Sequence, residues 1–292
     1  MKQVYVIGSI NTDLVINTPY IPQAGETLTG SGFFTARGGK GANQAVAAAR
    51  LGANVTMCGC VGDDDFGLSA LNALQAEGID VTYIRKVDGI PTGTAMIIVE
   101  NGDNRIILDK GANGFLSERD IDSALESAKA GDIYITQLEN PIEVVGYGMK
   151  KAKEKGMFVV LNPAPANSDI QPFLEYCDLI VPNESELELF GGKEKLLDKV
   201  STLVVTLGAD GHEIVTKVDE KKFPCMKVTP IDTTAAGDTF CGGMVTMLAQ
   251  GESLEDATRF GSLAASIACT RKGAQPSIPH RDEVLGFFKE TM

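Results

Sequence analysis

Short apolar, β-branched-rich runs alternate with helix-length amphipathic segments along most of this chain. The runs lie at 4–7, 55–61, 133–135, 158–161, 179–181 and 203–207, and helical patterns occupy 41–51, 66–77 and 142–155. Strands that are covered on both faces appear as continuous apolar runs, and parallel strands are connected through helices. The alternation therefore predicts an α/β fold, with a mainly parallel sheet and helices on both of its faces.

Two segments break this alternation. Residues 13–35 are strand-like but rich in turn residues, and residues 92–109 place an Asn101-Gly102 turn between two apolar runs, which is a hairpin signal. We expect a small sheet that projects from the main body as a lid or a dimer surface. Strands that extend the edge of the main sheet would show the same periodicity, so that alternative stays open. In the absence of a linker or repeat, we expect one domain over 1–292, with a β lid from about 13–37 and 91–109.

Composition excludes several classes of function. A net charge of −13 without a basic run is unfavourable for binding nucleic acid or an anionic membrane. No apolar run reaches the length of a membrane span, and the N-terminal run is too short for a signal peptide, so we expect a cytoplasmic protein. The cysteines lack metal-ligand spacing, and we expect reduced thiols at Cys58, Cys60, Cys177, Cys225, Cys241 and Cys269.

Three common catalytic or nucleotide-binding motifs are missing. Phe34 stands where a Walker A loop, read back from Gly39-Lys40, requires glycine. No G-x-G-x-x-G fingerprint follows the first predicted strand. Neither His212 nor His280 accompanies a recognisable serine or cysteine elbow. A P-loop enzyme, a Rossmann dehydrogenase and a triad hydrolase are therefore disfavoured.

The stretch from Asp232 to Gly243 places two carboxylates on either side of a small-residue turn. Apolar residues recur at helical spacing after Asp238, and Gly251 ends the pattern, so Gly237 and Asp238 fall in the first turn of a helix. Free N–H groups and the helix dipole make that turn an anion-binding cradle beside a carboxylate base. An ordinary glycine-rich entry to a core helix would have the same sequence. The stretch alone leaves both interpretations open.

A second glycine-rich cluster runs from Gly38 to Asn43, at the start of the Ala-rich helix. Glycines allow close approach of the backbone, and the amide of Asn43 could contact adjacent hydroxyls. Asn11 and Asp13 follow the first strand, at the sheet edge where α/β proteins bind ligands. The pattern suggests a polyol site, although tight turns and helix caps would explain any one of these residues.

Seven ordered motifs run along the chain: Gly8-Ser-Ile-Asn-Thr-Asp13, Gly38-Gly-Lys-Gly-Ala-Asn-Gln-Ala45, Asn162-Pro-Ala-Pro165, Pro182-Asn-Glu-Ser-Glu186, Thr206-Leu-Gly-Ala-Asp-Gly211, Asp232 to Phe240, and Thr270-Arg-Lys-Gly-Ala-Gln-Pro276. Through these motifs the whole chain resembles the ribokinase-like members of the PfkB-type carbohydrate kinase family. The resemblance implies a ribokinase-like three-layer sandwich with a central, mainly parallel sheet and a small β lid. It also implies ATP-dependent phosphorylation of D-ribose at the 5-hydroxyl, which gives ribose 5-phosphate and ADP.

Two alternatives to this activity remain. One is another sugar or nucleoside kinase of the family, acting on deoxyribose or fructose, although the acceptor pair Asn11 and Asp13 fits vicinal hydroxyls and favours ribose. The other is a non-catalytic sugar-sensing protein on the same fold, which should have lost the base or the glycine of the anion-binding loop. Asp238 and Gly237 are both present.

The resemblance also assigns roles to individual residues. Asp238 matches the catalytic base, and Ala235, Ala236 and Gly237 match the loop that forms the anion hole. The positions matching sugar-binding residues are Asn11, Asp13, Gly39, Lys40, Asn43 and Glu139, together with Asp238. ATP-binding positions are Asn183, Thr206, Leu207, Gly208, Ala209, Asp210, Gly211, Gly237 and Ser262. Ser262 stands where relatives often carry a larger polar side chain.

Metal ions and a second subunit are implied in the same way. Glu186 matches the position linked to Mg²⁺. The residues matching a K⁺ site are Asp232, Thr234, Ala268, Arg271, Gly273 and Ser277. A homodimer formed through the β lid is expected, and no nucleic-acid or membrane partner.

Overall fold

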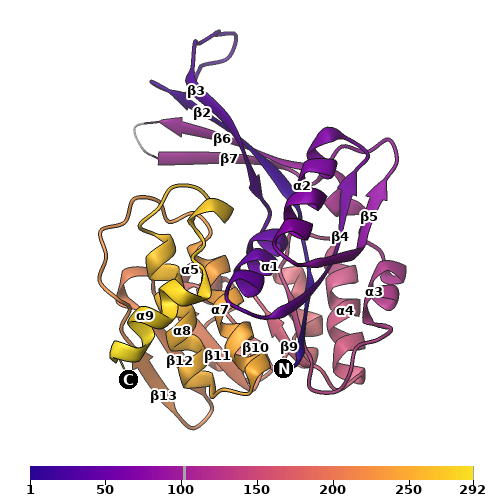
Figure 1. The fold of residues 1–292 in the computed structure, drawn as a ribbon, viewed down its shortest axis with the longest axis vertical. Helices are drawn as coiled ribbons and strands as arrows, with labels where there is room; N and C mark the ends of the chain where they lie inside the picture. The colour runs from indigo at the N-terminus through magenta and orange to yellow at the C-terminus, as the bar shows by residue number, and fades with distance from the viewer. Residues whose placement is uncertain (101–102, 292) are drawn as a thin grey trace.

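A large mixed sheet forms the centre of the protein (Figure 1). The computed structural model describes residues 1–100 and 103–291. The strands of this sheet are β1 (Gln3–Ile7), β4 (Asn54–Gly62), β5 (Asp80–Val87), β8 (Ile133–Thr136), β9 (Phe158–Leu161), β10 (Leu179–Ile180), β11 (Thr202–Thr206), β12 (His212–Thr216) and β13 (Glu220–Phe223). Their order is β13-β12-β11-β10-β9-β8-β1-β4-β5. Strands β11 to β5 in this order run parallel, whereas β12 and β13 are antiparallel to their neighbours. The α/β fold with a mainly parallel sheet is confirmed.

Helices cover both faces of the sheet because successive residues of each strand point to opposite sides. In β1, Val4 and Val6 pack into one apolar cluster, and Tyr5 and Ile7 pack into the other. The first cluster contains residues of α1 (Lys40–Arg50), α2 (Asp65–Ala76), α7 (Ala236–Gln250), α8 (Leu254–Ala268) and α9 (Arg281–Thr291). The second contains residues of η1 (Gly111–Phe115), α3 (Glu118–Leu125), η2 (Ser168–Tyr176), α4 (Ile142–Glu154) and α6 (Lys193–Leu197), with α5 (Glu184–Leu189) packed against it. The short helices η3 (Gly208–Asp210) and η4 (Gln275–Ser277) complete the fold.

Glycines bring α7 close to its two neighbouring helices. A Cβ on Gly242 would overlap the Cβ of Ala47 in α1, and a Cβ on Gly243 would lie 2.9 Å from the Cα of Gly261 in α8. Such close backbone contacts leave little freedom for the helices to shift. The N-terminal ends of α1 and α7, where the glycine-rich motifs lie, are therefore held in a fixed relationship.

A second, four-stranded sheet is formed by β2 (Asn11–Thr18), β3 (Ser31–Gly38), β6 (Gly93–Glu100) and β7 (Asp103–Asp109), in the order β3-β2-β6-β7. We call it the small sheet, and it projects from the main body (Figure 1). Extension of the main-sheet edge, the alternative left open by the sequence, is wrong. The predicted turn at Asn101 and Gly102 lies outside the described residues.

The chain reverses its direction of winding between β1 and β8. From β1 it proceeds outward to β4 and β5, and it then returns to β8 on the other side of β1 and continues to β11. The loops that leave β1 and β8 consequently diverge at the carboxyl ends of these neighbouring strands, which is where open α/β sheets bind ligands. Ser9 follows β1, and Gln137 and Glu139 follow β8.

None of the helices in the described ranges combines the length and apolarity that crossing a bilayer requires. All six cysteines are free thiols, and Cys58, Cys60, Cys177 and Cys241 are buried.

Candidate active site

The turn before α7 presents backbone N–H groups beside Asp238, of which that of Ala236 donates to the Thr233 carbonyl at 3.2 Å. Ala235 adopts a left-handed conformation (φ 59°), and it is the one non-glycine residue with positive φ in the described part of the chain. Since α7 begins at Ala236, Gly237 and Asp238 occupy its first turn, where N–H groups lack an intrahelical acceptor. A Cβ on Gly237 would meet no atom within 4 Å. The protein's own packing does not require glycine there, so the open space is available to a ligand.

Amides from α1 hold both carboxylate oxygens of Asp238. Asn43 Nδ2 donates to Oδ2 at 3.0 Å, and Gln44 Nε2 donates to Oδ1 at 3.0 Å. Asp238 is only 6% exposed. The Oδ1 atom of Asn43 is buried and accepts no hydrogen bond from the described residues, so it can still accept one from a ligand hydroxyl.

The side chain of Asn11 is oriented by Asn113, a residue that the sequence analysis missed. Asn113 Nδ2 donates to Asn11 Oδ1 at 2.7 Å and to the Ile10 carbonyl at 3.0 Å, while the Ile10 N–H donates to Asn113 Oδ1 at 2.9 Å. The backbone groups of Ile10 determine the orientation of Asn113, so Asn113 donates to Asn11 Oδ1. No partner of Asn11 Nδ2 is found in the part of the chain that the structure describes. Asn11 is thus prepared to donate to a ligand oxygen.

Glu139 has one occupied carboxylate oxygen. Its Oε2 accepts hydrogen bonds from the hydroxyl of Ser9 and, at 3.2 Å, from the backbone N–H of Lys40. Gly39 (φ 89°) lies so close to Asn11 that an added Cβ would be 2.7 Å from its backbone nitrogen. The loops after β1, β3 and β8 therefore meet, and no protein donor to Glu139 Oε1 is found within the described ranges.

Asp13 lies buried near two other carboxylates. Burial, with the charges of Glu139 and Asp238, raises the pKa of Asp13 from 3.8 to about 6. A Cβ on Gly38, which pairs with Asn11 in the adjacent strand β3, would overlap the Asp13 carboxylate. Glycine at that position therefore leaves room for the acid, and hydroxyl donors from a ligand would stabilise its ionised form.

Lys40 provides positive charge next to these acids. Burial lowers its pKa, but the carboxylates of Asp238, Glu139 and Glu186 raise it by more, so the net pKa is above the ordinary value. Its side chain lines a cavity of about 240 Å³ with Asn183, Glu186, Thr206, Ala235, Ala236, Gly237 and Asp238, and with the unpredicted Asn162, Ala164, Val181, Thr233 and Cys241. A cation, a base and free N–H groups surround one small space that suits a phosphoryl group.

Asn183 and Glu186 form a reciprocal cap on α5. Glu186 N–H donates to Asn183 Oδ1 at 2.8 Å, and Asn183 N–H donates to Glu186 Oε2 at 2.9 Å. Burial raises the pKa of Glu186, although the Asn183 hydrogen bond and Lys40 oppose this rise. No cluster of three His, Cys, Asp or Glu ligands occurs among the described residues. A lone carboxylate fits Mg²⁺, which keeps several water ligands and is usually shared with substrate phosphates.

The two predicted K⁺ loops are joined by Asp232. Its Oδ1 accepts from the Thr234 N–H at 2.9 Å and from the Thr234 hydroxyl at 2.6 Å, and its Oδ2 accepts from the Gly273 N–H at 2.9 Å. Arg271 directs its guanidinium to Glu283 rather than to this junction. Asp232 thus holds the two predicted K⁺ loops together, and the K⁺ site itself stays a prediction.

The predicted nucleotide segment divides into two parts. Thr206 bridges to Asn183 and lines the small cavity, whereas Leu207–Gly211 forms a tight turn in which the Leu207 N–H donates to the Gly211 carbonyl at 2.9 Å. Gly208 (φ 56°) faces open space, but a Cβ on Gly211 (φ 97°) would overlap the Phe223 carbonyl. Gly211 is thus required by the fold, and Gly208 leaves room for a ligand. Ser262 is buried in α8 and lines neither the small cavity nor the groove described next.

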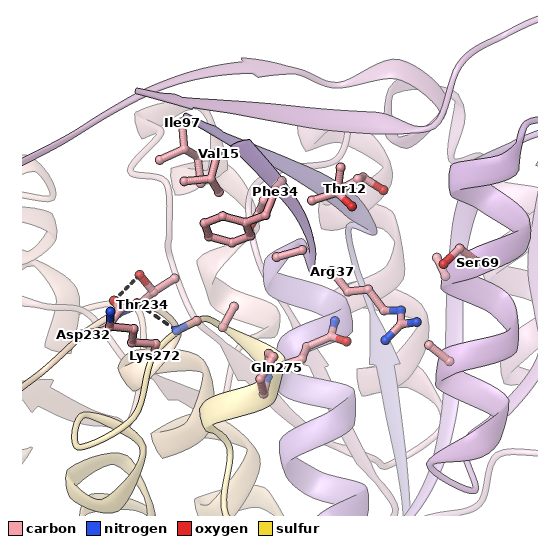
Figure 2. Close-up of a pocket in the computed structure, with 18 of the residues that line it drawn as sticks. Thr12, Val15, Phe34, Arg37, Ser69, Ile97, Asp232, Thr234, Lys272 and Gln275 are labelled. Carbon is pink, nitrogen blue, oxygen red and sulfur yellow. Dashed lines mark hydrogen bonds between the residues drawn. The ribbon is translucent and has the colours of Figure 1, made fainter. Parts of the chain in front are cut away.

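A wider groove of about 1180 Å³ lies between the small sheet and the main body. Val15, Phe34 and Ile97 extend into it from the small sheet, across from Asp232, Thr234 and Lys272 (Figure 2). Asp13 and Thr233 line it as well, and Thr233 also lines the small cavity. The groove is therefore next to the small cavity, and it is the small cavity that Asp238 lines. We accordingly assign the reacting groups to the small cavity.

Three amides near Asp238 escaped the sequence analysis as site residues: the buried Gln44 and Gln137 and the half-buried Asn162. Gln44 follows Asn43 directly and Gln137 precedes Glu139 by two positions, so adjacency to predicted residues was the available signal. The hydrogen bonds that link these amides to one another and to Asp238 span 93 to 194 positions, which no local pattern reveals.

Similarity to a known family accounts for this site. The family model described as pfkB family carbohydrate kinase matches residues 1–281. The chain belongs to the PfkB family of carbohydrate kinases. The ribokinase of Haemophilus influenzae is 43% identical over 302 residues, covering 99% of each protein. The deoxyribokinase of Salmonella typhi is 39% identical over 289 residues and covers 94% of each.

Solved structures of PfkB-type kinases share the fold over the full length. The ribokinase of Thermotoga maritima matches with a TM-score of 0.90 and 36% identity, over 99% of this chain and 100% of that one. The ribokinase of Arabidopsis thaliana, complexed with ribose and ATP, matches with a TM-score of 0.87 and 30% identity over 99% of both chains. The ribokinase-like fold is confirmed, and the protein is a phosphotransferase with a sugar hydroxyl as acceptor.

Proposed function

We propose that the protein transfers the γ-phosphoryl group of ATP to the 5-hydroxyl of D-ribose, giving ribose 5-phosphate and ADP. The observation that carries the proposal is the position of Asp238. Its carboxylate lies in the first turn of α7, beside free N–H groups, and is hydrogen-bonded to Asn43, whose other amide atom remains available. Base, anion cradle and sugar-binding amide are thus contiguous. Full-length relatives that are ribokinases support the choice of sugar.

Asp238 acts as the base in this reaction. The proton of the 5-hydroxyl moves to the carboxylate as the sugar oxygen forms a bond to the γ-phosphorus and the bond to the ADP oxygen breaks. Phosphoryl transfer depends mainly on positioning and charge stabilisation. The N–H groups of the turn from Ala235 to Gly237, together with the Lys40 ammonium, stabilise the charge on the transferring group.

The sugar is held by complementary donors and acceptors. Asn11 donates through Nδ2, because Asn113 occupies its Oδ1. Asp13, Glu139 and Asn43 accept hydrogen bonds from hydroxyls. Gly39 and Lys40 contribute through the loop that connects β3 to α1. Several acceptors and one donor fit a ring with adjacent hydroxyl groups.

The nucleotide binds on the other side of the small cavity. We place the ATP phosphates near Asn183 and Gly237, and the nucleoside along Thr206, Leu207, Gly208, Ala209, Asp210 and Gly211, with Ser262 near the base. Glu186 would hold Mg²⁺, which neutralises phosphate charge when bound. Asp232 and the carbonyl-rich loops at Thr234, Ala268, Arg271, Gly273 and Ser277 would hold K⁺, which adds positive field beside the anion cradle. Since ATP is the co-substrate, we propose action in the cytoplasm.

The small sheet serves as a lid and as a dimer surface in this proposal, within one domain over 1–292. It covers the groove that contains Asp13. Several large apolar side chains on it are at least 50% exposed: Phe33, Phe34, Met96, Ile106 and Ile107. Exposed apolar clusters of this kind commonly mark protein interfaces, and a second copy of the chain would cover them.

Product analysis with one variant tests the function. Incubation with ATP, Mg²⁺, K⁺ and D-ribose should yield ribose 5-phosphate, identified by ³¹P NMR. The variant Asp238→Asn should lose about 10²–10⁴-fold in kcat while ribose still binds in calorimetry. Absence of a phosphorylated pentose with the unchanged protein would refute the proposal. Full activity of the variant would exclude Asp238 as the base.

A deoxyribose kinase is the second candidate, because the Salmonella typhi deoxyribokinase covers nearly the whole chain. We prefer ribose as the substrate because Asn11 and Asp13 provide two polar groups for two adjacent hydroxyls. Deoxyribose lacks one of these two hydroxyls. A sugar-sensing protein is disfavoured because Asp238 and Gly237 are both present and both line the small cavity.

A further inference from the structure

The backbone carbonyl of Val181 determines the orientation of the amides of Asn162 and Gln44 next to Asp238. Asn162 Nδ2 donates to the Val181 carbonyl at 3.1 Å, so Asn162 Oδ1 must face the opposite side. Gln44 Nε2 donates to that oxygen at 3.1 Å and also to Asp238 Oδ1 at 3.0 Å. Reversal of the Gln44 amide would direct its oxygen at two acceptors, which is unfavourable.

Gln137 supports Gln44 from the other side. Its Nε2 donates to Gln44 Oε1 at 2.6 Å, so both polar atoms of the Gln44 amide have partners. Gln44 is completely buried, and Gln137 is 1% exposed. The remaining Gln137 oxygen lies where a Cβ of Gly8 would be and accepts no hydrogen bond in the described ranges. Gly8 therefore makes room for Gln137, whose amide oxygen stays buried and unpaired while its Nε2 supports Gln44.

The contacts of Gln44 differ from those of Asn43. Gln44 and Asn43 both donate to Asp238, but the amide of Gln44 has all of its partners within the protein. Asn43 keeps a free acceptor, which suits a residue that also contacts the sugar. Gln44 thus has no atom left for a ligand, and its only contact with the reacting groups is through Asp238.

We propose that Gln44 is a positioning residue for the base. Held by Asn162 and Gln137, it occupies Oδ1 of Asp238 and fixes the plane of the carboxylate, so that Oδ2, on the side of Asn43, receives the hydroxyl proton. The inference rests on the proposed function of Asp238. It assigns no contact between Gln44 and either substrate.

The variant Gln44→Met, which keeps side-chain length and removes the amide, tests this role. Because a 1 Å misplacement of reacting groups can cost about 10²-fold, we expect kcat to fall roughly 10- to 100-fold with little change in ribose affinity. The loss should appear in kcat with the KM for ribose nearly unchanged, a split that damage to the sugar-binding residues would not produce.

A double-mutant cycle separates positioning from general damage. In the Asp238→Asn background, Gln44→Met should cause no further loss of the residual activity, because its effect passes through Asp238. The variant Gln137→Met should lower kcat in the same direction and to a smaller extent, and it provides the test if Gln44→Met does not fold. The matched control is Gln3→Met, which removes an amide donor to Thr56 at the other end of β1 and should leave kcat unchanged.

Each outcome distinguishes the two proposals. Wild-type kcat in folded Gln44→Met and Gln137→Met, with Asp238→Asn inactive, would overturn the positioning role alone. An additional loss in the Asp238→Asn background, or weaker ribose binding in calorimetry, would likewise contradict it. An active Asp238→Asn protein would instead refute the assignment of the base.

Discussion

Asn43 Nδ2 donates a hydrogen bond to Asp238 Oδ2 at 3.0 Å, although the two residues are 195 positions apart. Asn43 lies in the first turn of α1 and Asp238 in the first turn of α7, and the contact of Gly242 with Ala47 holds these helices together. The packing of two helices thus places a sugar-binding amide on the base. The distance between acceptor hydroxyl and base is a property of the core and does not depend on a mobile loop.

The first prediction concerns the open space above Gly237. Gly237→Ala should leave the melting temperature nearly unchanged, because the new methyl group meets no protein atom within 4 Å. It should lower kcat by about 10²-fold, comparable to the loss of one donor in an anion hole, since the methyl group enters the space for the phosphoryl group. Gly286→Ala, where the added methyl group also meets nothing, is the control. Equal activity of the two variants would show that no anion binds at Gly237.

The second prediction concerns the raised pKa of Asp13. Between its ordinary pKa of 3.8 and about 6 the folded protein binds more protons than the unfolded chain, so this carboxyl lowers stability as pH rises through that window. Asp13→Asn should therefore stabilise the ligand-free protein at pH 8, by at most about 3 kcal/mol, and by much less near pH 4. Thermal unfolding at both values checks this. A stability difference independent of pH would contradict the environment described for Asp13.

The affinity for ribose should depend on the ionisation of the same Asp13 carboxyl. Hydroxyl donors favour the ionised carboxylate, so the affinity of the wild-type protein for ribose should increase from pH 5 to pH 7. The variant Asp13→Asn should bind ribose weakly and without this increase. Calorimetry across the pH range measures both.

The third prediction concerns the loops joined by Asp232. Replacement of K⁺ by Na⁺ or by tetramethylammonium should lower kcat, because neither ion has the size of the K⁺ that we propose binds there. K⁺ should also raise the melting temperature of the wild-type protein. In Asp232→Ala, which loses the hydrogen bond to the Gly273 N–H, that rise should disappear. If kcat and the melting temperature do not depend on which cation is present, the proposed K⁺ site is wrong.

The fourth prediction concerns the small sheet. If a second copy covers its apolar residues, light scattering should give the mass of a dimer, and the double variant Phe33→Lys/Ile107→Lys should give a monomer. These side chains are 63% and 62% exposed, so the substitutions should not disturb the fold of the subunit. A monomeric wild-type protein at assay concentration would contradict the proposed dimer.

The features of the fold and site that could be predicted from the sequence are those formed by residues close together in the chain. The alternation of strands and helices is local, and it predicted the parallel sheet. The turn from Asp232 to Asp238 is local as well, so its helix start was recognisable. In contrast, Gln44 and Asn113 act through contacts made only after distant segments pack. The antiparallel pair β12 and β13 was missed because the turn from Gly208 to Gly211 looks the same before a hairpin as before a crossover.

A comparison of acceptors tests the central claim most directly. With ATP, Mg²⁺ and K⁺ held constant, kcat/KM should be measured for D-ribose, 2-deoxyribose, D-fructose and adenosine. We expect the highest value for D-ribose, with 2-deoxyribose at least about tenfold lower, because one polar group of the pair Asn11 and Asp13 would stay unpaired. A higher kcat/KM for any of the other three would contradict the assignment of ribose as the substrate.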